Sequence, residues 1–178
     1  MTDDPLANDR VTFWCRAAAQ FGGPVLVLGC GTGLVALPVA AQGLAVTAVD
    51  RDAARLARAR VRSEEAELDI RFVHGALHEL ALGRRFGTVI LDGARLDAFE
   101  AGARQSALLA AVERHLAPEG GFGVEFRAST GGDAREELHV LLAPTALEIV
   151  AQYGGWDFSR VKAGGERLIA LCRLRADE

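Results

Sequence analysis

The sequence feature that most constrains the fold is an apolar run at residues 24–28, followed at once by a bend rich in glycine. The run reads Pro-Val-Leu-Val-Leu, and the next five residues read Gly-Cys-Gly-Thr-Gly. Successive side chains of a β-strand point to opposite faces, so an uninterrupted apolar strand has both faces covered. Residues 24–28 therefore predict a strand inside a parallel sheet that carries helices on both sides.

The same pattern recurs along the chain and sets the fold class. Further apolar runs occupy residues 45–49, 88–91, 122–126 and 168–174. Stretches that favour helix lie between them, at residues 33–42, 52–68 and 99–117. Strands that alternate with helices predict an α/β fold with a doubly wound, mostly parallel sheet, which binds ligands at the carboxyl ends of its strands.

The two ends of the chain depart from this alternation. A helix is expected from Asn8 or Asp9 to Phe21, with one buried stripe formed by Val11, Trp14, Cys15 and Ala18. Near the other end, a short helix at residues 133–142 leads to a strand at 147–152 and to the run that ends at residue 174. These two strands predict a terminal hairpin. Together with a third strand that precedes the loop flanked by His74 and His78, the expected sheet has seven strands, of which one C-terminal strand is antiparallel.

Length and charge limit the classes of function. With 178 residues, the chain fits a single domain spanning residues 1–178. Half of the residues are hydrophobic (50%), a quarter are charged (25%) and the formal net charge is −4, with acidic and basic residues mixed along the chain. No positive field attracts a phosphate backbone, so we expect no nucleic-acid partner.

Cysteine usage and the start of the chain indicate the compartment. Cys15, Cys30 and Cys172 lie far apart and show no metal-ligand spacing with one another or with the four histidines, so we expect free thiols and no metal. The acidic first residues lack the pattern of a secretory signal, and no window is long and apolar enough to span a membrane. These features favour a cytoplasmic protein without a membrane partner.

The glycine bend and one later carboxylate predict the ligand. The dinucleotide pattern G-x-G-x-x-G fails because Leu34 stands three residues after Gly31, and no Gly-Lys-Ser/Thr follows to make a Walker loop. Asp50 ends the second strand about 20 residues beyond the bend, where a carboxylate can accept both hydroxyls of a ribose. The pair is more specific than either half.

Residues 28–33, which read Leu-Gly-Cys-Gly-Thr-Gly, resemble the first motif of class I S-adenosylmethionine-dependent methyltransferases, in particular the small Rossmann-like methyltransferase domains. The segments 25–60, 71–91, 108–126 and 153–174 are each similar to the corresponding segment of that family. The resemblance implies a Rossmann-like methyltransferase fold, S-adenosylmethionine as cofactor and a small-molecule acceptor. The residues that it implies at the cofactor are Gly29, Cys30, Gly31, Thr32, Gly33, Asp50, Arg51, Ala76, Leu77 and Asp92.

The resemblance also implies a role for each part of the site. The bend would face the methionine and ribose portions, Asp50 the ribose hydroxyls and Arg51 the adenine. A backbone N–H at Leu77 would read the adenine ring, and residues 91–93 would close the pocket at the methionine end.

Two polar positions of the family are apolar in this chain. Val27 stands where an acidic residue usually helps to hold the cofactor's amino group, and Ala76 lies in the loop where an Asp usually contacts the adenine amine. These departures keep a second hypothesis open: a homologue that binds the cofactor without catalysis, as a partner or regulatory subunit.

Methyl transfer from a sulfonium needs alignment of the reactants and no covalent nucleophile. The catalytic residue is not identified by the sequence. A general base is needed only if the acceptor must lose a proton, and Asp92, after the fourth strand, is the best-placed candidate for that role or for contact with substrate or cofactor. His74, His78 and Glu125 are each more consistent with structural roles, as is Cys30. No Asn/Asp-Pro-Pro-Tyr/Phe motif follows the fourth strand, which disfavours nucleobase and similar amine acceptors. Because little surrounds the core fold, a second copy of the chain or a partner subunit is an alternative source of the missing site walls.

Overall fold

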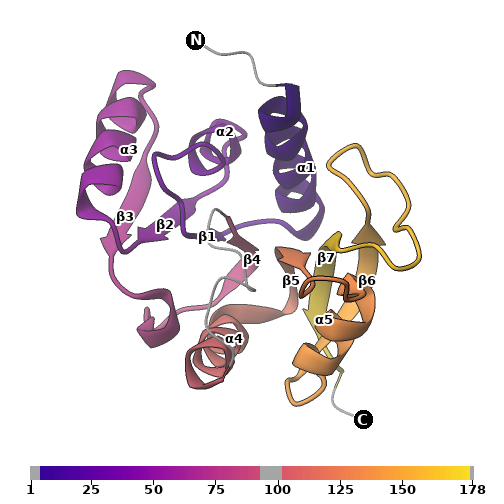
Figure 1. Cartoon of the computed structure of the whole chain (residues 1–178). Helices are drawn as coiled ribbons and strands as arrows, with labels where there is room; N and C mark the ends of the chain where they lie inside the picture. Colours follow the sequence, from indigo (N-terminus) through magenta and orange to yellow (C-terminus); the bar gives the residue numbers. More distant parts are fainter. Residues whose placement is uncertain (1–4, 93–101, 177–178) are drawn as a thin grey trace.

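The computed structural model describes residues 5–92 and 102–176, which build a twisted seven-stranded sheet (Figure 1). The strand order is β3-β2-β1-β4-β5-β7-β6. The strands are β1 (Val25–Leu28), β2 (Val46–Asp50), β3 (Ile70–His74), β4 (Phe86–Leu91), β5 (Leu116–Arg127), β6 (Leu147–Tyr153) and β7 (Arg167–Leu174). All neighbouring pairs from β3 to β5 are parallel, whereas β7 runs antiparallel to both β5 and β6. The predicted mostly parallel sheet with one antiparallel C-terminal strand is confirmed.

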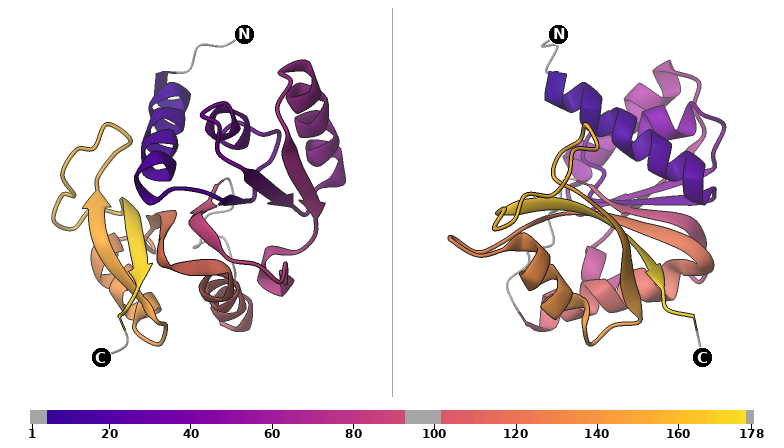
Figure 2. Two further views of the ribbon diagram at one scale, coloured as in Figure 1. Left: turned by 180° about the vertical axis from the view of Figure 1, so that it is seen from behind. Right: turned by 90° about the vertical axis from the view of Figure 1, so that its right-hand side faces the viewer.

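Helices cover both faces of the sheet (Figures 1 and 2). On one face lie α1 (Pro5–Phe21), α2 (Ala36–Ala40) and α3 (Ala53–Glu65), and on the other lie α4 (Ala103–His115) and α5 (Ala134–Leu142). A short 3₁₀ turn, η1 (Leu77–Glu79), follows β3 and packs beside α4. The sheet is therefore the middle of three layers.

The apolar run of β1 explains this layering. Val25 and Val27 belong to the hydrophobic cluster under α1 and α2, whereas Leu26 and Leu28 belong to the cluster on the α4 side. All four side chains are buried. The prediction that this strand is covered on both faces is confirmed, since each face of β1 buries its own half of the run.

Several predicted helix boundaries are wrong, for local reasons. The helix expected at residues 33–42 is only α2, because Gly33 has a φ of 86°, which no α-helix contains. In α3, Asp52 is the cap and not the first helical residue, since its side chain accepts the N–H groups of Ala54 and Arg55 at 2.9 and 3.0 Å. The helix at residues 99–117 begins at Ala103 among the described residues, and residues 93–101 lie outside them.

The N-terminal helix also differs from its prediction. It starts at Pro5, so Asn8 and Asp9 lie inside it and do not cap it. Its buried stripe contains Phe13 and Ala17 beside the predicted Trp14 and Ala18, while Val11 and Cys15 are only partly buried. The stripe is rotated because the helix packs over two glycines of the sheet.

Glycines on β5 form the seat of α1. A Cβ at Gly123 would overlap the Trp14 ring, and a Cβ at Gly121 would overlap the Phe21 ring. The missing side chains let both rings lie directly on the sheet, so α1 approaches it closely. This contact fixes where the start of α1 lies above the carboxyl ends of the strands.

Candidate functional site

The glycine bend lies at the carboxyl end of β1, in the middle of the sheet. Gly29, Gly31 and Gly33 have φ values of 72°, 54° and 86°, which side-chain-bearing residues rarely adopt. The N–H groups of Gly29 and Cys30 both donate to the Val49 carbonyl, at 2.8 and 3.0 Å, which folds the bend back over β2. No heavy atom lies within 4 Å of the position that a Cβ of Gly31 would take. The outer surface of the bend is thus open backbone that a ligand can approach closely.

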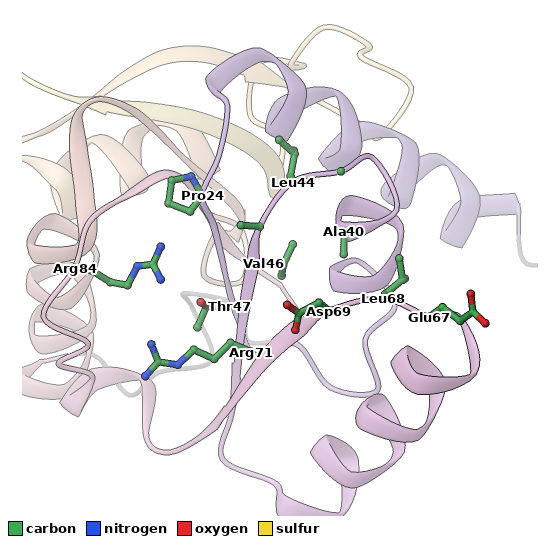
Figure 3. A pocket seen from close by; sticks show the side chains of 12 residues that line it. Pro24, Ala40, Leu44, Val46, Thr47, Glu67, Leu68, Asp69, Arg71 and Arg84 are labelled. Atoms are coloured by element: carbon green, nitrogen blue, oxygen red, sulfur yellow. The ribbon is translucent and has the colours of Figure 1, made fainter.

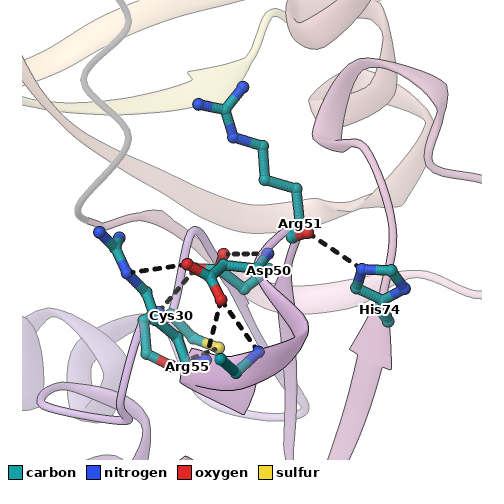
Figure 4. A network of polar contacts seen from close by, with 8 residues as sticks. Cys30, Asp50, Arg51, Arg55 and His74 are labelled. Atoms are coloured by element: carbon teal, nitrogen blue, oxygen red, sulfur yellow. Dashed lines mark hydrogen bonds and ion pairs between the residues drawn. The ribbon is translucent and has the colours of Figure 1, made fainter.

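Asp50 connects the bend to the next helix. One carboxylate oxygen accepts the Gly31 N–H at 2.8 Å and the other accepts the Asp52 N–H at 2.9 Å. The side chain is 6% exposed and belongs to the polar network in Figure 4. The two halves of the sequence pattern are therefore joined by a direct hydrogen bond, and the remaining lone pairs of the carboxylate can accept hydroxyl groups.

The residues after Asp50 and β3 form one side of the site. His74 Nε2 lies 3.0 Å from the Arg51 carbonyl oxygen, so the ring donates to the turn after β2 (Figure 4). The Gly75 N–H donates to the Asp50 carbonyl at 3.1 Å. Ala76 caps η1 without a side-chain hydrogen bond, and the Leu77 side chain is buried in the core on the α4 side. Only backbone groups of these two residues are thus suited to polar recognition.

Thr32, in the glycine bend, is bound by a side chain of α3. Its carbonyl accepts a hydrogen bond from the Arg62 guanidinium at 2.9 Å. His78 is part-exposed and lies 3.7 Å from the Glu79 carboxylate, which fits the structural role expected of it.

Asp92 borders the bend on the β4 side, whereas Asp50 borders it on the β2 side. Asp92 follows β4 directly, its N–H donates to the Leu28 carbonyl at 2.8 Å, and its side chain is 4% exposed. Its carboxylate forms an ion pair with the guanidinium of Arg10, which comes from α1. Gly93, predicted beside it, lies outside the described residues. Sequence reasoning missed Arg10 because one arginine on an amphipathic helix carries no local signal of its partner.

Cys30 lies under the bend between these two carboxylates. The pKa of its thiol is raised to about 12. Burial is the main cause, and the nearby negative charges of Asp50 and Asp92 contribute to the same increase. At pH 8 the thiol is therefore protonated and not the nucleophilic thiolate. Cys30 therefore fills space and does not act as a nucleophile.

The Cys30 thiol should consequently resist alkylation in the native protein. We expect iodoacetamide at pH 8 to modify Cys30 and the equally buried Cys172 far more slowly than after unfolding in urea, because the pKa of each thiol is raised to about 12 by burial. Peptide mass spectrometry of timed samples measures this. Modification of native Cys30 at the rate of the unfolded chain would contradict the prediction.

Glu125 lies on β5, two residues after Gly123 and on the same face of the sheet, the face that α1 covers. Its carboxylate is 3.7 Å from the Arg127 guanidinium and 3.6 Å from that of Arg167, on β7. The Arg167 guanidinium also lies 6.0 Å from the centre of the Trp156 ring. Glu125 is thus paired within the sheet, as expected for a structural role.

A separate cavity opens at the other end of the strands (Figure 3). It has a volume of about 490 Å³ and is lined by Pro24, Val46 and Thr47 together with charged side chains that include Arg71 and Arg84. None of the predicted cofactor residues lines it. Because parallel sheets bind ligands at the carboxyl ends of their strands, this cavity is not part of the candidate site.

Within residues 5–92 and 102–176, no three His, Cys, Asp or Glu side chains gather in a way that could hold a metal ion. In the same ranges, no helix combines the length and the hydropathy needed to cross a membrane.

Comparison with known proteins gives one family and several relatives. Residues 25–120 match the model of a family described as a methyltransferase domain. Ubiquinone biosynthesis O-methyltransferase of Rickettsia akari (strain Hartford) is 35% identical over 66 residues, which are 37% of this chain and 26% of that protein. Cypemycin N-terminal methyltransferase of a Streptomyces species is 31% identical over 126 residues, which are 67% of this chain and 50% of that protein. The chain thus spans half or less of the length of these relatives.

A solved structure shares the fold over nearly the whole chain. The S-adenosylmethionine-dependent methyltransferase from Clostridium acetobutylicum ATCC 824 superimposes with a TM-score of 0.81 and 16% sequence identity, covering 96% of this chain and 92% of the other. At this identity the similarity shows a common architecture, and the residues of the site have to be argued from this chain alone.

Proposed function

Because this chain belongs to the methyltransferase domain family, with a class I S-adenosylmethionine-dependent fold, we propose that it transfers the methyl group of S-adenosylmethionine to a small-molecule acceptor. The observation that carries the proposal is the hydrogen bond from the Gly31 N–H to the Asp50 carboxylate, 2.8 Å long, beneath an open glycine bend. Together these groups fit a nucleoside whose ribose hydroxyls bind the carboxylate.

The cofactor, S-adenosylmethionine, supplies an activated methyl group on a sulfonium sulfur. In this proposal Asp50 holds the ribose, the backbone of residues 29–33 faces the ribose and methionine portions, and Arg51 and the backbone at Leu77 border the adenine. Asp92 stands at the methionine end. We assign no covalent role to any residue, because alignment alone can supply about 7–11 kcal/mol of the barrier.

The acceptor class rests on charge and on what the relatives act on. The net charge of −4 disfavours a nucleic-acid acceptor. One relative is named for ubiquinone biosynthesis and another for the N-terminus of cypemycin, so oxygen and nitrogen acceptors both occur among similar proteins. We therefore propose a small molecule and leave the methylated atom to experiment.

One observation favours a second candidate, a homologue that binds the cofactor without turnover. Val27 is fully buried among apolar side chains and Ala76 makes no side-chain hydrogen bond, where the resemblance implies carboxylates. Such a chain would act as a partner or regulatory subunit.

Titration calorimetry followed by a turnover assay separates these possibilities. We expect S-adenosylmethionine and S-adenosylhomocysteine to bind with one site per chain. We also expect release of S-adenosylhomocysteine in the presence of at least one member of a panel containing phenols, carboxylic acids, amines and peptides with a free N-terminus. Binding without turnover across the panel favours the subunit hypothesis, and lack of binding overturns both.

We propose that residues 1–178 form one methyltransferase domain. We also propose that the protein works in the cytoplasm, and the free thiols of Cys15, Cys30 and Cys172 support this compartment. A second copy of the chain is a candidate for completing the acceptor site. Gel filtration that shows a strict monomer with cofactor present would count against that copy.

A further inference from the structure

We propose that Arg71, Arg84 and Thr47 bind a phosphate dianion, either free or esterified to a small organic molecule, in the cavity at the amino ends of the strands. This cavity lies at the end of the sheet opposite the glycine bend, so the phosphate site is separate from the one assigned to the cofactor. Binding there does not depend on the proposed function.

Thr47 is a buried polar residue in the wall of the cavity. It is 3% exposed, and within residues 5–92 and 102–176 its hydroxyl has no hydrogen-bond partner. Thr88, which is also buried, donates its hydroxyl hydrogen to the Gly22 carbonyl at 2.7 Å. Because a buried hydroxyl without a partner is unfavourable, Thr47 is suited to a ligand that accepts its hydrogen.

Arg71 is placed beside Thr47 by the register of the sheet. The two residues are Cα partners in the parallel pairing of β2 and β3, and Thr47 is in turn paired with Leu26 of β1. Leu26 belongs to the hydrophobic cluster on the α4 side. Since Cα partners on neighbouring strands point to the same face, Arg71 and Thr47 both project on the α4 side.

Arg84 reaches the cavity from the loop before β4. Its guanidinium lies 5.0 Å from the centre of the ring of Phe86, a fully buried residue two positions later. This cation–π contact restricts where the arginine side chain can lie. Figure 3 shows the guanidinium groups of Arg84 and Arg71 on two sides of the Thr47 side chain.

Neither arginine is neutralised by a carboxylate in the described part of the chain. There, both side chains are exposed, and neither guanidinium forms an ion pair or a hydrogen bond with another residue. Glu67 and Asp69 also line the cavity, but Figure 3 shows their carboxylates on the side away from the two guanidinium groups. One side of the cavity therefore presents two unpaired positive charges beside an unpaired hydroxyl.

These three groups match the chemistry of phosphate. A guanidinium donates to two phosphate oxygens through its planar fork, and a hydroxyl donates to a further oxygen. A phosphate dianion neutralises both positive charges, whereas a carboxylate neutralises one. The cavity has a volume of about 490 Å³ and includes apolar surface at Pro24, Leu44 and Leu68, against which the organic part of a phosphate monoester can pack.

Calorimetric titration in phosphate-free buffer tests this site. The probes are inorganic phosphate, phenyl phosphate and phenol, which lacks the phosphate. We expect phenyl phosphate and inorganic phosphate to bind at a single site per chain and phenol not to bind. Tighter binding of phenyl phosphate identifies a monoester as the ligand, and equal affinities identify free phosphate.

The same titrations with excess S-adenosylhomocysteine separate the two ends of the sheet. We expect unchanged affinities for both phosphates, because the cofactor site lies at the other end of the strands. Competition by S-adenosylhomocysteine would place the phosphate in the cofactor site and overturn the assignment. If S-adenosylhomocysteine itself does not bind, the proposed function fails while the phosphate titrations keep their meaning.

Three variants test the named side chains. Arg71→Ala and Arg84→Ala should each lower the affinity for phenyl phosphate about tenfold to hundredfold, because each removes charge-assisted hydrogen bonds. Thr47→Val should lower it about fivefold, the effect of one neutral hydrogen bond. Urea unfolding should show no loss of stability for Thr47→Val, because the hydroxyl that it removes has no partner among the described residues.

Matched variants separate recognition from folding and from general charge. Arg58→Ala removes an exposed arginine of α3 that does not line the cavity, and it should leave both phosphate affinities unchanged. Arg71→Lys and Arg84→Lys keep the positive charge without the planar fork, so they should retain part of the affinity and serve where an alanine variant does not fold. A wild-type protein that binds neither phosphate, or folded arginine variants that bind with unchanged affinity, would show that this assignment is wrong.

Discussion

Replacement of Asp50 by alanine is expected to lower the affinity for S-adenosylhomocysteine more than a hundredfold. In the proposed complex the carboxylate accepts two ribose hydroxyls, and a hydrogen bond to a charged group contributes about 1.5–3 kcal/mol, where 1.4 kcal/mol corresponds to a factor of ten. The substitution also removes the acceptor of the Gly31 and Asp52 N–H groups, which loosens the bend itself. Calorimetric titration of the purified variant measures the loss.

A shorter ligand, 5′-methylthioadenosine, is the control for this prediction, because it carries the ribose but lacks the amino-acid end of the cofactor. Asp50→Ala should weaken the binding of 5′-methylthioadenosine as strongly as that of S-adenosylhomocysteine, since both carry the ribose. Asp52→Ala, two residues later, removes the cap of α3 while leaving the Asp50 carboxylate in place, so its effect on affinity should be much smaller. An Asp50→Ala protein that is folded and binds with unchanged affinity would remove the basis of the functional proposal.

Replacement of Trp14 by alanine is expected to destabilise the protein by about 3–5 kcal/mol, the usual cost of deleting a buried large aromatic side chain. Trp14 is 1% exposed and lies against Gly123, Phe13 and Trp156. No neighbouring side chain of β5 can fill the space, because glycine occupies the position beneath the ring. Urea unfolding followed by circular dichroism measures the change in the free energy of unfolding.

Two further variants serve as comparisons for the stability of Trp14→Ala. Trp14→Phe keeps most of the ring and removes an indole N–H that is buried without a hydrogen-bond partner in the described residues, so it should cost far less than alanine. Val140→Ala changes a side chain that is 70% exposed and should be nearly neutral. A Trp14→Ala protein as stable as Val140→Ala would show that α1 is not anchored as described.

Much of the fold follows from local sequence patterns. The apolar run at residues 24–28 has to be covered on both faces wherever it lies, and the glycines after it permit backbone conformations that other residues rarely adopt. The position of Asp50 at the end of the next strand brings it to the same edge as the bend, because the carboxyl ends of parallel strands coincide. These constraints act within a strand, a turn or a pair of adjacent parallel strands, so the sequence alone was enough to predict the sheet and this half of the candidate site.

The pairing of Asp92 with Arg10 was decided only by tertiary packing. Arg10 and Asp92 are separated by 82 positions in the sequence, and no periodicity or spacing links them. They meet because the glycines at 121 and 123 let Trp14 and Phe21 lie on the sheet, which sets the position of α1 above the strand ends. Two helix boundaries, in contrast, were set locally, by the side-chain cap at Asp52 and by the positive φ of Gly33. Local propensities determine which segments form helices and strands, but the angle and depth at which a helix packs depend on the shapes of side chains that are distant in the sequence.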